Sequence, residues 1–304
     1  MKTKISILSA LIVLFALFSG CEEENSGQTG TVKLSITDAP VDNDQITGVY
    51  ITVDGLKYHK QDTGGSGWQT FDEYEGPKTF NLLELTDGMT AALGTFEMEA
   101  GQYNQLRFTM DIADKPAGTF NSSGCYLVKN ETDTIPLFVP SGGQSGYKAT
   151  GAFRVPSNGT VNLTADWDAR KAVVKAGAGH YILRPTIRLI AEGEAGKING
   201  SIKELPAEYS SIGVHAYEDD TYDNSTQTQA TDSTNLFSDA VTSDVMGVDG
   251  GFQLNWLAPG TYDLVVVKNI GGDFDSVLGI KQDVALESDE TKSITIDISD
   301  LSIQ

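Results

Sequence analysis

The chain has 304 residues and a formal net charge of -21 at pH 7, with 42 acidic side chains against 21 basic ones. Such a charge repels phosphate backbones, so we expect no binding to nucleic acid. The cysteines are Cys21 and Cys125, too few for a disulfide framework or for a zinc site built on cysteine.

The first 20 residues predict an export signal. Lys2 and Lys4 precede an apolar run over residues 5–18, which is too short for a stable membrane-spanning helix. The run ends in Phe18-Ser19-Gly20-Cys21, which resembles the lipobox of bacterial lipoproteins. That resemblance implies cleavage after Gly20 and a lipid on Cys21, which would leave Cys125 without an intrachain partner. An ordinary secretory peptide is the alternative.

Residues 21–30 predict a solvated polar tether, because no large apolar side chain follows Cys21 there. Glu22, Glu23 and Glu24 stand directly behind the cysteine. These acids resemble the signal that exports lipoproteins of Bacteroidetes to the outer face of the outer membrane. We therefore expect a protein held in the outer membrane by its lipid and facing the cell exterior. A periplasm-facing anchor is the alternative.

Residues 31–193 read as short β-rich segments separated by Gly, Asp, Asn and Pro, which favours one β-sandwich domain. Val32, Leu34 and Ile36 alternate with polar residues, so the first strand has one buried face. A helical turn is expected only at 169–175. Further strands are expected at 49–53, 78–85, 95–99, 103–111, 125–129, 134–139, 148–155, 160–167 and 181–192.

A second set of strands follows the boundary at Glu192-Gly193-Glu194-Ala195-Gly196. Strands are expected at 197–202, 213–217, 238–246, 251–256, 261–268, 278–286 and 292–298. Their spacing suits a sandwich over residues 196–304, interrupted by a long exposed polar loop at 218–237. The predicted fold class is therefore all-β, with two Greek-key-type β-sandwich domains.

Six blocks in the first of these domains occur in the order of a known family. They are the segments at 34–42, 80–88, 100–107, 139–148, 165–171 and 181–188. Together they resemble bacterial lipoproteins that contain domain of unknown function 4382. The resemblance implies no known activity and provides no functional residues to transfer.

Four blocks in the second domain resemble another family. They are the segments at 196–202, 213–217, 250–254 and 257–262, the last of which contains Pro259-Gly260-Thr261-Tyr262. They are similar to the transthyretin-like, carboxypeptidase regulatory-like sandwich, which is grouped with starch-binding-like folds. The resemblance implies a scaffold or binding module.

Two groups of acids are candidate calcium ligands. Asp38, Asp42 and Asp44 cluster around one turn, and Glu218, Asp219, Asp220 and Asp223 cluster in the long loop. Calcium takes oxygen ligands from flexible loops, although neither group matches the spacing of a known calcium loop. Solvated acidic turns are the alternative, and we expect no other cofactor.

Catalytic patterns are weak. Asp166 and Asp168 flank Trp167, which suits either a glycosidase acid–base pair or the polar outer face of a strand. Ser145-Gly146-Tyr147-Lys148 has the spacing of serine acyl enzymes, but it precedes a strand instead of beginning a helix. We therefore expect no enzymatic activity, with a secreted hydrolase based on the two aspartates as the remaining catalytic alternative.

The three histidines fall in separate segments, which disfavours a zinc site or a catalytic triad. They are His59, His180 and His215. We expect each of them at the surface or at a strand edge.

Aromatic side chains beside acids and amides are candidate platforms for sugar rings. Trp68 follows a glycine-rich turn, while Tyr217 and Tyr222 stand at the start of the polar loop. Trp256 is better explained by core packing, since Leu254 and Leu257 surround it. We expect a non-enzymatic, lipid-anchored cell-surface binding or scaffold protein, with glycan as the leading ligand. The alternative is an assembly lipoprotein that contacts an envelope protein through a sheet edge.

Overall fold

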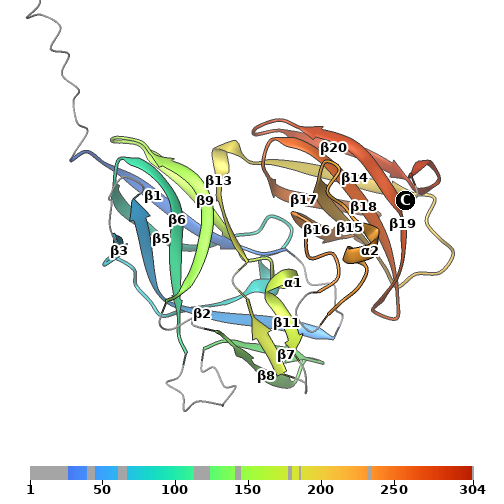
Figure 1. Ribbon diagram of the computed structural model, residues 1–304, viewed down its shortest axis with the longest axis horizontal. Coiled ribbons are helices and arrows are strands. Elements are labelled where there is room, and N and C mark those ends of the chain that lie inside the picture. The colour runs from blue at the N-terminus through green and yellow to red at the C-terminus, as the bar shows by residue number, and fades with distance from the viewer. Residues whose placement is uncertain are drawn as a thin grey trace, which may run out of the picture.

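The protein is described here by a computed structural model, which covers residues 27–39, 45–60, 67–112, 124–140, 145–176, 180–184, 186–231 and 235–302. The chain is all-β, as predicted, with strands in nearly every part of the described residues (Figure 1). Within the described residues, helical structure is limited to α1 (Ala169–Ala172), α2 (Asn224–Gln227) and the short 3-10 turns η1 (Leu82–Glu84), η3 (Glu192–Glu194) and η4 (Ile298–Asp300). No described helix has the length and apolar character needed to cross a membrane.

The strands up to residue 191, here called the N-terminal half, belong to one 13-stranded sheet among the described residues. Its main path runs β11-β12-β8-β7-β2-β6-β9-β13-β10-β1-β5, and β3 and β4 both pair with β2. The strands are β1 (Thr29–Thr37), β2 (Ile46–Lys60), β3 (Trp68–Thr70), β4 (Lys78–Asn81), β5 (Ala91–Glu99), β6 (Gly101–Met110), β7 (Tyr126–Lys129), β8 (Asp133–Phe138), β9 (Tyr147–Val155), β10 (Thr160–Asp166), β11 (Val173–Ala176), β12 (His180–Leu183) and β13 (Ile187–Ala191).

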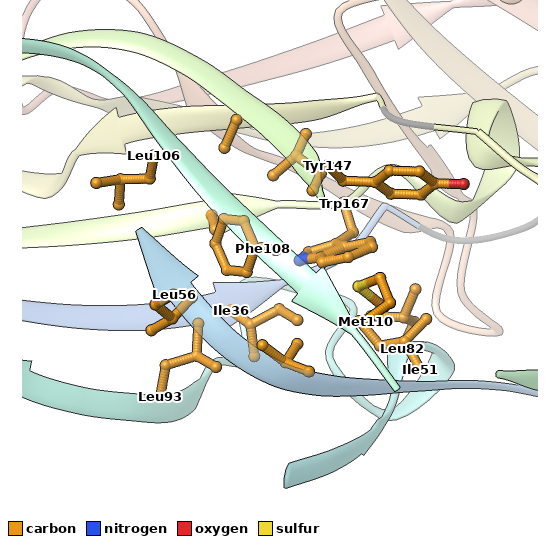
Figure 2. Close-up of a cluster of buried hydrophobic side chains, with 14 of the residues drawn as sticks. Ile36, Ile51, Leu56, Leu82, Leu93, Leu106, Phe108, Met110, Tyr147 and Trp167 are labelled. Carbon is orange, nitrogen blue, oxygen red and sulfur yellow. The ribbon is translucent and has the colours of Figure 1, made fainter. Parts of the chain in front are cut away.

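The core of the N-terminal half follows from the period-two pattern of its strands. Val32, Leu34 and Ile36 of β1 are buried, as the alternation predicts. Side chains from distant parts of the sheet path meet in the same cluster, in which the ring of Phe108 packs edge-on against Trp167 at 5.6 Å between centroids (Figure 2). The sheet therefore folds around a single apolar interior.

The strands after residue 195, here called the C-terminal half, form two sheets. One has the order β17-β14-β20 and the other β16-β15-β18-β19. Ile198 and Leu254 from the first sheet share a core with Val214 and Val266 from the second. The strands are β14 (Gly196–Lys203), β15 (Ser211–Glu218), β16 (Thr242–Val245), β17 (Gly251–Leu257), β18 (Gly260–Ile270), β19 (Asp273–Leu286) and β20 (Thr291–Asp297).

Each half contains the same tyrosine corner. The hydroxyl of Tyr103 donates to the carbonyl of Glu99 at 2.8 Å, and the hydroxyl of Tyr262 donates to the carbonyl of Ala258 at 2.7 Å. Both rings are buried. In each case the hydroxyl satisfies a carbonyl four residues earlier in the chain, where a turn leads into the strand.

Candidate functional site

Two of the three candidate aromatics are buried. Tyr217 is 0% exposed and Tyr222 is 7% exposed, and their rings pack edge-on with centroids 5.0 Å apart. The hydroxyl of Tyr217 donates to Gln227 at 3.0 Å. Neither ring offers a face to a ligand, so the prediction of exposed platforms is wrong for both tyrosines.

The polar composition of residues 218–237 predicts an exposed loop, but part of this segment is helical and part of it is buried. It carries α2, and Phe237 at its end is 3% exposed. Phe237 and Tyr222 belong to one small apolar cluster with Val265 of β18. The segment therefore folds back over the four-stranded sheet of the C-terminal half.

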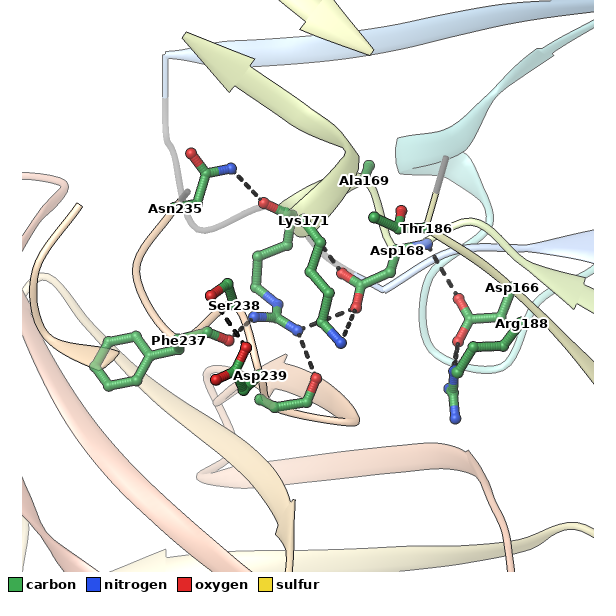
Figure 3. Close-up of polar contacts among 12 residues, drawn as sticks. Asp166, Asp168, Ala169, Lys171, Thr186, Arg188, Asn235, Phe237, Ser238 and Asp239 are labelled. Carbon is green, nitrogen blue, oxygen red and sulfur yellow. Dashed lines mark hydrogen bonds and ion pairs between the residues drawn. The ribbon is translucent and has the colours of Figure 1, made fainter. Parts of the chain in front are cut away.

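A buried guanidinium joins this segment to the N-terminal half (Figure 3). Arg170 of α1 donates to the carbonyl oxygens of Phe237 and Ala240, the second at 3.2 Å. In return, the amide of Asn235 donates to the carbonyl of Arg170 at 2.6 Å and to that of Val173 at 2.8 Å. These contacts hold the two halves together through polar groups on both sides.

Asp166 and Asp168 lie in the same buried network. They are 2% and 1% exposed. Asp166 is ion-paired with Arg188, and Asp168 with Arg170 at 3.1 Å and with Lys171 at 3.2 Å. Asp168 also caps α1 by accepting the backbone N–H of Lys171. The prediction of a polar outer face is therefore wrong, and the ion pairs give both carboxylates a structural role.

Asp38, a candidate calcium ligand, is also buried, at 5% exposed. Its Oδ1 accepts the backbone N–H of Ala169 at 2.6 Å. Burial raises the pKa of this carboxyl well above its ordinary value, and the nearby charges of Asp166 and Asp168 raise it further. Asp42 and Asp44 lie outside the described residues, as does Cys21.

Three other carboxylates approach one another in the C-terminal half. Asp219, Asp220 and Asp263 offer oxygens within 4.8 Å of one another. The two oxygens of Asp263 already accept backbone N–H groups, from Asp220 and from Asp283, each at 3.2 Å. Asp223 from the predicted loop cluster instead caps α2. The sequence pattern does not reveal Asp263 as a neighbour of Asp219 and Asp220, because it lies on β18, far along the chain from the loop.

The histidines separate into different environments. His180 is exposed and begins β12, as predicted. His215 is 0% exposed and stacks on Phe237 at 4.4 Å, so its predicted place at the surface is wrong. Burial lowers the pKa of His215 well below its ordinary value, and the nearby charge of Arg170 lowers it further. His59 lies beside Trp68, with 5.5 Å between ring centroids.

Trp68 is the candidate aromatic that reaches the surface, where it is partly exposed on β3. Its neighbour across the strand pair is His59 of β2. The guanidinium carbon of Arg107, from β6, lies 3.9 Å from the centroid of the indole ring. Such a stack fixes the orientation of both side chains.

Three cations are aligned beside this ring. Lys57 of β2 is the register partner of Arg107, which is in turn the register partner of Lys148 on β9. The neighbours of each cation along its strand point into the core or pack against it, so all three cations face outward. We call Trp68, His59, Lys57, Arg107 and Lys148 the Trp68 surface. Strand periodicity alone gives the outward direction of each cation, but only the register shows that they are adjacent.

Trp256, expected in the core, is half-buried and lies between the two halves. Arg188 donates to its carbonyl at 3.5 Å. It lines a hollow of about 420 Å³ with Arg188, Glu194 and Pro259. A second cavity between the halves, of about 250 Å³, is lined in part by Arg170, Tyr181 and Phe237.

Comparisons with known proteins place the chain in a family. No curated protein matches the sequence. The Bacillus anthracis TIE protein matches at 10% identity and a TM-score of 0.20, over 88% of this chain and 34% of its own, so this chain spans about a third of its length. A putative adhesin from Bacteroides ovatus matches at 10% identity and a TM-score of 0.22, over 88% of both chains. The shaft pilin SpaA from Lactobacillus rhamnosus GG matches at 13% identity and a TM-score of 0.20, over 88% of this chain and 97% of its own. Likenesses at these TM-scores carry no argument about function.

The family model described as Domain of unknown function (DUF4382) matches residues 29–185, which is more than half of the chain, and the protein therefore belongs to the DUF4382 family.

Proposed function

We propose that the protein is a non-enzymatic, lipid-anchored cell-surface protein that binds glycan at the Trp68 surface. The observation that carries the proposal is the partly exposed indole of Trp68, held by Arg107 on the outer face of the sheet. An aromatic ring among hydrogen-bonding side chains suits a sugar, whose ring packs on the indole while its hydroxyls bond the polar neighbours.

The buried network supports a scaffold over an enzyme. The oxygens of Asp166 and Asp168 are occupied by ion pairs with Arg188 and Arg170 in the buried network beside the joint between the halves. Arg170 bridges the two halves through hydrogen bonds to the carbonyl oxygens of Phe237 and Ala240. The two packed sheets of the C-terminal half support the proposal that it is a transthyretin-like, carboxypeptidase regulatory-like sandwich.

We place the protein in the outer membrane of a bacterium of the Bacteroidetes type, held by lipid on Cys21 and facing the cell exterior. The lipobox-like sequence and the acids behind it support this proposal. Several acyl chains, at about 0.8 kcal/mol per buried methylene, make such an anchor stable.

Membrane fractionation tests the anchor. We expect the wild-type protein in the outer-membrane fraction and the Cys21→Ser variant in the soluble fraction. Cys125→Ser is the matched control, because Cys125 is buried in the core of the N-terminal half. A Cys21→Ser variant that stays entirely with the membrane contradicts the lipid anchor.

A glycan array tests the binding function. The chain from Glu22 onward, which retains every described residue, is applied with calcium and with chelator. We expect glycan binding that Trp68→Ala weakens at least tenfold and that Tyr209→Ala, at an exposed aromatic outside the Trp68 surface, leaves unchanged. Glycan binding that is lost when chelator is added would indicate a calcium site at the acidic turns. Absence of any glycan binding, together with one co-purifying envelope protein, would favour the assembly role instead.

A further inference from the structure

The charge pattern of the Trp68 surface is unusual for this chain. Lys57, Arg107 and Lys148 are direct neighbours across β2, β6 and β9, and adjacent strands lie about 4.8 Å apart. Like charges placed opposite one another destabilise a sheet. The protein nevertheless places three of its 21 basic side chains side by side.

Acidic side chains are missing from the same outward positions. The row that contains the three cations begins with Thr70, and the next row consists of Trp68, His59, Gln105 and Thr150. Across β3, β2, β6 and β9 neither row contains Asp or Glu, although acids outnumber bases two to one in the chain. Beyond Thr150 the second row continues to Arg188 of β13 and its ion-pair partner Asp166 of β10. Within the described residues, no ion pair involves Lys57, Arg107 or Lys148.

The side chain of Arg107 is held in place by its neighbours in the Trp68 surface. Its guanidinium lies against the indole of Trp68 on one side. Its stem passes close to Gly146, where an added Cβ would stand 2.8 Å from Arg107 Cγ. A guanidinium held in one orientation loses little side-chain entropy when it binds an anion with its planar set of donors.

We propose that the Trp68 surface binds an anionic polysaccharide, one whose sugars carry carboxylate or sulfate groups. This inference rests on the proposed glycan binding and assigns the ligand class. The three cations take the acidic groups along the row, and Trp68 contacts a sugar ring beside them.

A membrane is a poorer partner for this surface. Binding to a lipid surface needs exposed apolar side chains as well as cations. The large exposed apolar side chains of the described residues are Met89, Leu205, Tyr209, Val248 and Ile270, and none of them belongs to the two rows. The overall charge of -21 repels an extended anionic bilayer more strongly than it repels one strand of polymer on a local patch.

The test compares four probes on the chain from Glu22 onward. They are polygalacturonate, dextran sulfate, neutral dextran and phosphatidylglycerol vesicles. We expect binding to the two acidic polymers that weakens as salt is raised from 50 to 300 mM, because salt screens exposed charges. The triple variant Lys57→Gln/Arg107→Gln/Lys148→Gln is expected to lose at least tenfold in affinity.

A matched variant controls for total charge. Lys33→Gln/Lys203→Gln/Lys281→Gln removes three exposed cations from other strands and is expected to bind like wild type. Arg107→Lys keeps the charge but loses the planar stack, and we expect a three- to tenfold loss. Circular dichroism and thermal melting confirm that each variant is folded.

The outcomes separate the ligand class from the proposed function. Binding to neutral glycans that depends on Trp68 but not on the three cations overturns the anionic class and leaves glycan binding intact. Failure to bind any glycan overturns both. Binding to the vesicles without the polymers replaces the polysaccharide with an anionic lipid surface. An equal loss of affinity in the Lys57→Gln/Arg107→Gln/Lys148→Gln variant and in the matched variant on other strands also overturns the inference. Net charge would then explain the effect.

Discussion

The carboxylate of Asp38 accepts the backbone N–H of Ala169 at 2.6 Å, across 131 residues of sequence. The contact ties the end of β1 to the start of α1, next to the ion pairs of Asp166 and Asp168. Because Asp38 is buried, its ionised form is costly, and the joint between distant segments becomes sensitive to protonation.

We therefore predict that Asp38→Asn stabilises the protein most at high pH. The pKa of Asp38 is raised in the folded state, so its contribution to stability is present below the pKa of the unfolded chain and is lost as pH rises through the folded pKa. Asparagine keeps an acceptor for Ala169 without the charge. Thermal melts at several pH values between 4 and 8 measure the difference between variant and wild type.

Asp223→Asn is the control for this prediction. Hydrogen bonds from Ser225 lower the pKa of Asp223, so its contribution is present above the unfolded pKa and is lost as pH falls. Between pH 4 and 8 the difference between Asp223→Asn and wild type should therefore change little, and its opposite trend should appear only as pH falls below about 4. A difference between Asp38→Asn and wild type that stays constant from pH 4 to 8 contradicts the assigned burial cost.

Arg170→Ala should strongly destabilise the protein. It leaves Asp168 and two carbonyl oxygens with fewer partners in a buried site, and removing one member of a buried ion pair costs about 3–5 kcal/mol. Lys171→Ala removes a partly exposed partner of the same carboxylate and should cost less. Urea unfolding measures both. Equal losses in the two variants would show that Arg170 does not join the halves.

The tyrosine corners should contribute similarly and independently. Tyr103→Phe and Tyr262→Phe each remove one hydroxyl that bonds a carbonyl four residues earlier, at a cost of about 1 kcal/mol. Because the corners lie in different cores, the double variant should lose the sum. Unfolding free energies from urea titration check this. A clear excess in the double variant would mean that the two corners are coupled.

Gly146→Ala should destabilise the protein more than Gly271→Ala. Both glycines have positive φ, at 68° and 64°, so both substitutions strain the backbone. An added Cβ at Gly146 would also meet Arg107 and the carbonyl of Phe108 at 2.8 Å, whereas at Gly271 no described atom beyond its two chain neighbours lies within 4 Å of that position. The difference in melting temperature isolates this steric contact. Identical shifts would show that the stem of Arg107 yields freely.

The parts of the fold that depend on local pattern could be predicted from the sequence. The alternation in β1 and the turn at Ala169 each rest on a few neighbouring residues. The burial of Tyr217 could not be predicted, because its polar sequence neighbours hide a partner segment that ends at Phe237. The alignment of Lys57 with Arg107 was equally hidden, since it depends on the register between two strands and on the bulges within them.

The pairing of β1 also determines how the protein responds to tension. β1 runs parallel to β10 from Thr31 to Thr37 and antiparallel to β5 from Thr29 to Ile36. A pull on the chain ahead of Thr29 acts along the strand, perpendicular to its hydrogen bonds with β5 and across its slanted hydrogen bonds with β10. Those bonds share the load and must shear together, so the protein can resist drag on its N-terminal end without unzipping one pair at a time.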